Sequence, residues 1–186
     1  MTFPPIAVQV LLVLLVIPAA IWDLFERRVP NWLTLPGVLL GFGLNMILFE
    51  SAGFWMALRG LGLALLIYFP LYLLRGIGAG DVKLMAAIGA VVGPANWLAI
   101  FVITALIGGV SALVLLAAKG RLQKTFGNIW LILLRVSHGR APFQDDPQLD
   151  VRTEQGLRLP HAVIIACGAL VLLALALLER KGWGML

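Results

Sequence analysis

The sequence predicts an all-α polytopic membrane protein with about six transmembrane helices. Of its 186 residues, 61% are hydrophobic and 12% are charged, whereas soluble domains average about 25% charged residues. The apolar residues are gathered into runs close to the roughly 20 residues that a helix needs to cross a bilayer. These observations exclude a disordered chain and a soluble globular domain. We therefore expect a single membrane domain over residues 1–186.

The first three expected spans are residues 6–22, 32–49 and 54–74. The first run differs from a secretory signal peptide, because its basic residues, Arg27 and Arg28, follow the apolar stretch instead of preceding it. We interpret it as a retained span.

The other expected spans are residues 82–93, 97–118 and 159–178. A glycine-rich segment precedes residue 82, and Pro94 follows the run that begins there. A helix of 12 residues extends only about 18 Å, against a hydrocarbon core of about 30 Å. The sequence therefore predicts a short or broken helix at this point.

The polar stretch 119–158 is expected to form a cytoplasmic loop. Within it, residues 128–134 carry apolar side chains at helical spacing, which predicts an amphipathic helix lying on the membrane. Two interpretations are open for this stretch. It is a solvated loop with a surface helix, or it binds anionic lipid or an assembly partner through its charges.

The basic residues predict the orientation. With the N-terminus outside and six crossings, eleven of the 14 Lys and Arg residues fall on the cytoplasmic side, as the positive-inside rule requires. This bias explains the net charge of +5, and nucleic-acid binding is not expected because no basic stripe with interleaved aromatic residues occurs. The single cysteine, Cys167, excludes an internal disulfide and a multi-cysteine metal site. We expect neither a metal nor a cofactor.

Two acidic residues stand where spans end or begin. Asp23 ends the first span, and Asp81 opens the short helix, so both are expected at the cytoplasmic face. Two carboxylates held close together share a proton, so that one can activate water while the other donates to a carbonyl. Alternatively, Asp81 is a helix N-cap and Asp23 belongs to a solvated charge cluster with Glu26. His161 is expected only to mark the entry of the last span.

Three segments together resemble the type IV prepilin peptidases, which are intramembrane aspartic proteases. Gly78-Ala79-Gly80-Asp81 and the run through Gly89 are similar to the family's Gly-x-Gly-Asp segment. Asp23, followed by basic residues and then Pro30-Asn31, resembles its first catalytic motif. The opening of the last span, with Pro160 before His161, is similar to its C-terminal segment. The likeness covers roughly residues 18–168.

The positions that match the motifs are Asp23, Asp81, Gly78, Gly80, Lys83 and Asn31. The resemblance implies that the two aspartates are catalytic, that the two glycines shape the active-site loop, and that the lysine and asparagine support it. The implied substrates are pilin-like precursors, whose short basic leader is removed at the cytoplasmic face of the bacterial inner membrane.

The sequence departs from the larger family members, which carry paired Cys-x-x-Cys motifs linked to N-methylation. Methyltransferase activity is therefore not expected, and the short form resembles the peptidases of tight-adherence (Flp-type) pilus systems. The alternatives are a small ion-coupled transporter in which the aspartates relay protons, a non-catalytic assembly subunit, and another Gly-x-Gly-Asp protease. Transporter sites usually lie near the bilayer midplane within a repeat, whereas these acids stand at span ends and no repeat is evident.

Overall fold

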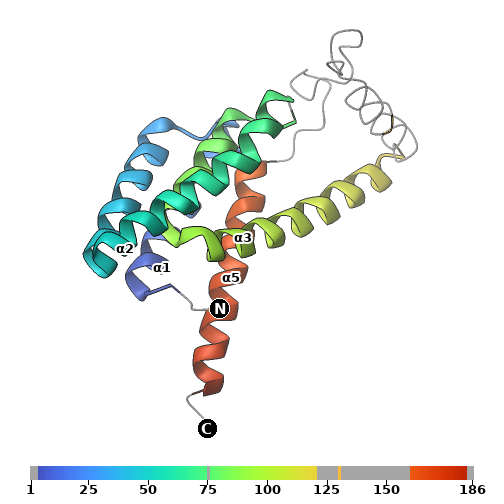
Figure 1. The fold of residues 1–186 in the computed structure, drawn as a ribbon. Coiled ribbons are helices and arrows are strands. Elements are labelled where there is room, and N and C mark those ends of the chain that lie inside the picture. The colour runs from blue at the N-terminus through green and yellow to red at the C-terminus, as the bar shows by residue number, and fades with distance from the viewer. Residues whose placement is uncertain (1–3, 75, 121–129, 131–159, 184–186) are drawn as a thin grey trace.

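The described part of the chain is helical. The computed structural model describes residues 4–74, 76–120, 130 and 160–183, and no strand occurs among them. Its long helices are α1 (Ile6–Glu26), α2 (Asn31–Leu73), α3 (Ala79–Ala118) and α5 (His161–Trp183) (Figure 1). Each has the length and apolar composition to cross a membrane. The all-α prediction is therefore confirmed.

The expected count of six transmembrane helices is not supported, because the described residues form four long apolar helices. The expected breaks near residues 50–53 and at Pro94 are bends within helices. Glu50 in α2 and Gly93 in α3 have non-helical backbone angles, and the helical structure resumes directly after each. A break in an apolar pattern marks where the chain changes direction, but it does not require a loop.

The connection from α1 to α2 is short and tightly turned. Arg27 ends α1 in the left-handed conformation (φ 52°), and its N–H donates to the carbonyl oxygen of Asp23 at 3.0 Å. Pro30 then precedes the first residue of α2, a place where the ring does not disturb helical hydrogen bonding. The end of α1 and the start of α2 therefore lie close together.

The bend in α2 folds this helix back on itself (Figure 1). Glu50 has φ 53° and ψ −135°, which reverses the chain direction. Gly53 is required just after the bend, because a Cβ there would collide with the carbonyl oxygen of Asn45. The Asn45 amide, which is fully buried, donates from Nδ2 to the carbonyl oxygens of Ala90 and Val91, each at 3.0 Å. It thereby joins α2 to α3.

The first part of α3 is the centre of the fold. Every residue from 84 to 93 is buried, which explains why this run is apolar on all sides. The run looked too short to span a bilayer because Gly93 and Pro94 break its pattern, but it is the first part of a helix of 40 residues. After the bend at Gly93 (φ 74°), the second part of α3 first packs against α5, where Thr104 lies beside Gly168. The end of α3 then extends away from the other helices (Figure 1), and none of residues 105–118 is buried.

Two glycines allow the second arm of α2 to touch the first part of α3. A Cβ on Gly60 would collide with the carbonyl oxygen of Gly89, and a Cβ on Gly89 with that of Gly60. The two backbones therefore meet without intervening side chains, and neither position accepts a larger residue without moving a helix.

Two further expectations concern the C-terminal third of the chain. The predicted loop 119–158 with its surface helix at 128–134 lies outside the described residues, except for Lys119, Gly120 and Trp130. The last expected span, 159–178, corresponds to α5, which begins at His161 and continues to Trp183.

The glycine crossing predicts a position-specific loss of stability. Gly60→Ala should lower the free energy of unfolding by about 1–3 kcal/mol, because overpacking forces the backbones apart. Gly62→Ala is the matched control: a Cβ there meets nothing within 4 Å, and alanine is the better helix former. Thermal unfolding in detergent compares the two variants, and equal stability would contradict a tight crossing.

Candidate active site

Asp23 lies at the end of α1, with its side chain turned into the protein. It is 8% exposed although it stands in the last turn of the helix. The backbone N–H of Ala162, in the first turn of α5, donates to Asp23 Oδ2 at 3.0 Å. The end of α1 is thereby joined to the start of α5, and Asp23 is no member of a solvated surface cluster, unlike the exposed Glu26.

Asp81 lies in the first turn of α3. The N-cap residue is Gly78, not Asp81, and the Gly78 N–H donates back to Asp81 Oδ2 at 3.3 Å. Hydrogen bonds from N–H to oxygen usually measure about 2.7–3.2 Å between the heavy atoms, so this bond is slightly longer than usual. Asp81 therefore contributes to the capping of α3 from position N3, as the acid of a capping box, and does not occupy the N-cap position itself.

Asp81 lies within electrostatic range of three other ionisable side chains. The electrostatic interactions of Asp81 include Asp23 and His161, and Tyr68 in α2 interacts with Asp81 in turn. Tyr68 is 5% exposed and packs edge-on against Trp97, with ring centroids 6.2 Å apart. Four helices thus each bring one ionisable side chain to the same end of the bundle.

The α1–α2 connection packs against the start of α3. A Cβ on Gly80 would lie 3.2 Å from the backbone nitrogen of Val29, which is tighter than an ordinary contact. Next to this contact, Lys83 Nζ donates to Asn31 Oδ1 at 2.8 Å. The structure therefore brings the two predicted motifs together, with Asp23 and Asn31 on one side and Gly80 and Lys83 on the other.

Three groups at this end were not among the predicted site residues. His161 was expected only to mark the start of a span, while Tyr68 and the Ala162 N–H were not considered. Pro160, placed just before an apolar run, was the available signal that a helix begins there. Every residue except proline carries a backbone N–H, so the sequence does not indicate which one contacts Asp23. The contact of Ala162 could be found only in the structure.

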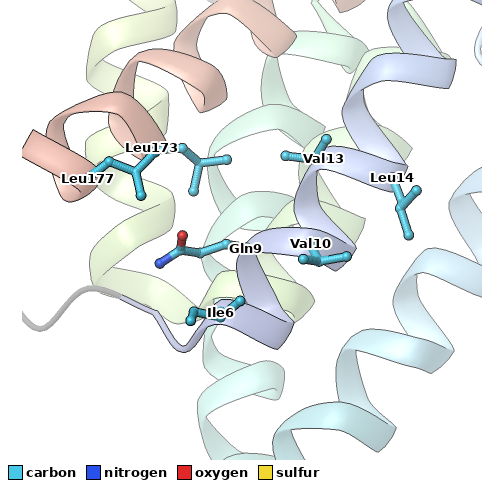
Figure 2. A pocket seen from close by; sticks show the side chains of 7 residues that line it. All are labelled: Ile6, Gln9, Val10, Val13, Leu14, Leu173 and Leu177. Carbon is cyan, nitrogen blue, oxygen red and sulfur yellow. The ribbon is translucent and has the colours of Figure 1, made fainter.

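An apolar hollow lies between the first turns of α1 and the later turns of α5 (Figure 2). Gln9, which lines it, precedes Asp23 by 14 residues, about 20 Å along a helix. The Gln9 amide is already engaged, since Nε2 donates to the Pro4 carbonyl oxygen at 2.7 Å. Within the described ranges, no group of three or more His, Cys, Asp and Glu residues is placed to hold a metal ion.

Comparison with known protein families shows the family to which the chain belongs. The sequence model of the type IV leader peptidase family matches residues 10–113, more than half of the sequence. The chain belongs to the type IV leader peptidase family. Membership indicates a peptidase, and with the four apolar helices it indicates a membrane protein. The comparison with curated proteins found no match, and neither did the comparison with solved structures.

The match shows which parts of this leader peptidase are shared with the family. Both aspartates, Gly80 and the Lys83–Asn31 contact lie within residues 10–113, whereas α5 lies beyond them. The start of α5 nevertheless contacts Asp23. The candidate site therefore includes a helix that the family match does not cover.

The contact between Lys83 and Asn31 predicts a measurable coupling. Lys83→Met and Asn31→Ala should show a coupling free energy of about 0.5–1 kcal/mol in a double-mutant cycle, a modest value because both side chains are exposed. Unfolding in detergent gives the four free energies. As a control, Lys83→Met and Asn96→Ala should be additive, because the Asn96 amide donates to the Val92 carbonyl oxygen at 3.2 Å. Additivity of the first pair would contradict the hydrogen bond between Lys83 and Asn31.

Proposed function

We propose that the protein is an intramembrane aspartic endopeptidase that removes the basic leader from pilin-like precursors. The observation that carries this proposal is the packing of Val29, in the connection that follows Asp23, against Gly80, the residue before Asp81, which brings the two acids within electrostatic range at one end of the helices. Family membership supports a leader peptidase. The pairing of two carboxylates supports the aspartic type, because such pairs hydrolyse peptide bonds by activating water.

The proposed reaction uses the two carboxyl groups in complementary protonation states. The ionised aspartate accepts a proton from water, whose oxygen bonds to the scissile carbonyl carbon, while the protonated aspartate donates a hydrogen bond to the carbonyl oxygen. The tetrahedral intermediate then collapses. The C–N bond breaks, the carbonyl group forms again, and the leaving amine takes a proton from the aspartate that had accepted one from water. One water is consumed, and no covalent enzyme intermediate or cofactor is required.

The backbone before α3 is suited to an extended substrate. Gly78 has an extended conformation (φ −78°, ψ 151°) and is exposed, so it presents main chain without a side chain in the way. The precursor must be extended where it is cut, because an amide inside a helix is shielded by its own hydrogen bonds. A leader joined to an apolar helix offers such a peptide at the membrane border.

The charge around the candidate site supports a cytoplasmic location. Arg27, Arg28 and Lys83 are exposed at the end of the helices that carries the aspartates, and basic residues favour the cytoplasmic side. The start of α1 is then on the outer side of the bacterial inner membrane. Cleavage would occur where the precursor's basic leader leaves the bilayer.

The proposal predicts that both aspartates are essential. Asp23→Asn and Asp81→Asn should each reduce leader cleavage by roughly 10³-fold or more, because the members of a catalytic pair act as a unit. Purified variants are mixed in detergent with a pilin precursor, and cleavage is followed by gel shift.

Glu26→Gln is the matched control, since it removes an exposed carboxylate three residues from Asp23 and should cut at the wild-type rate. Cleavage at the wild-type rate by either Asn variant would overturn the aspartic mechanism. Failure of the wild type to cut any leader-bearing precursor would overturn the substrate class.

A further inference from the structure

The first turn of α5 contacts Asp23 in a way that the paired-aspartate mechanism does not itself require. The Ala162 N–H donates to Asp23 Oδ2 from a residue that is fully buried. Amides in the first turn of a helix have no partner within that helix, so this donor is free to bind a carboxylate. Because the contact is buried, water does not easily replace it.

We propose that the Ala162 N–H is a positioning group of the active site, which holds the Asp23 carboxylate in its reactive orientation. The inference rests on the proposed function, because it assigns a role at the same site. With Oδ2 fixed to α5, rotation of the carboxylate is restricted and Oδ1 keeps a set direction. The residue acts through Asp23 and does not itself touch the substrate.

The two aspartates are held to different degrees. The Asp23 bond of 3.0 Å comes from another helix, whereas the Asp81 bond of 3.3 Å comes from Gly78, only three residues away. The position of Asp23 therefore depends on how α5 is seated. His161, which immediately precedes Ala162, interacts electrostatically with Asp81, so the same turn also affects the second aspartate.

A tight helix crossing seats α5. A Cβ on Gly168 would collide with Thr104 Oγ1, which places α5 directly against α3. Gly168 follows Ala162 by six residues, about 9 Å along the helix. The first turn of α5 is therefore held close to a rigid contact, as a positioning element must be.

The test removes only the N–H. Ala162 is replaced by its α-hydroxy acid, which exchanges the backbone N–H for an ester oxygen and keeps the methyl side chain. The matched control makes the same exchange at Val163, the next amide of the first turn. Each ester also turns the preceding carbonyl into a weaker acceptor, that of His161 in one protein and that of Ala162 in the other. The two proteins therefore differ chiefly in whether the N–H that contacts Asp23 is present. Thermal unfolding checks that both fold.

We expect the Ala162 ester to lower kcat for precursor cleavage by roughly 10- to 100-fold, as small misplacements of catalytic groups do. KM and the cleavage position should remain within twofold of wild type, and the Val163 ester should match wild type in kcat. A wild-type kcat for the Ala162 ester, or equal losses in the two esters, would overturn the positioning role.

An infrared measurement separates this proposal from the proposed function. The carboxyl band that disappears in Asp23→Asn identifies Asp23, and it should shift in the Ala162 ester but not in the Val163 ester. An unshifted band would overturn the inference even if Asp23 is catalytic. A shifted band together with an active Asp23→Asn variant would instead overturn the aspartic mechanism, and with it the positioning role.

Discussion

Complete burial of the first part of α3 is the constraint around which the other helices are arranged. Residues 84–93 are enclosed on every side, which requires neighbours on all faces of a single helix. The second arm of α2 approaches through the contact between Gly60 and Gly89, and the first arm through Asn45. Asp81 stands three residues before the enclosed segment, so the packing that buries this segment also fixes the base of that aspartate.

The carboxylates at the end of this bundle are costly to bury, and helix starts reduce the cost. Asp23 accepts an N–H from the first turn of α5, and Asp81 accepts one from the residue that precedes α3. Both donors belong to the amides that a helix leaves unpaired at its N-terminus. The same arrangement therefore satisfies two helix ends and holds two acids near each other, in keeping with a site that hydrolyses peptides.

Much of the fold and the candidate site followed from the sequence. The apolar runs predicted an all-helical membrane protein, and the motifs around Asp23 and Asp81 predicted two segments that the structure places in contact through Gly80 and Val29. The count of six transmembrane helices is not supported, because the described residues form four long apolar helices, two of which change direction at the non-helical residues Glu50 and Gly93. Periodicity locates a change of direction but does not distinguish a bend from a loop.

Long-range contacts of the backbone could not be predicted from the sequence. The Ala162 N–H meets Asp23 across 139 positions of the chain, and every residue except proline carries such a donor. The catalytic roles of the matched residues remain predictions, and so does the cytoplasmic location of the site.

The account depends most directly on the closeness of Asp23 and Asp81. The decisive measurement is intramolecular cross-linking of Asp23→Cys with Asp81→Cys in a Cys167→Ala background, by a short bifunctional thiol reagent and with mass spectrometry as the readout. The pair Glu26→Cys and Asp81→Cys serves as the control, because Glu26 is exposed at the same end of α1. The account predicts that the first pair is bridged faster and more completely than the control. Equal bridging of both pairs, or none in the first, would contradict a site built from these two aspartates.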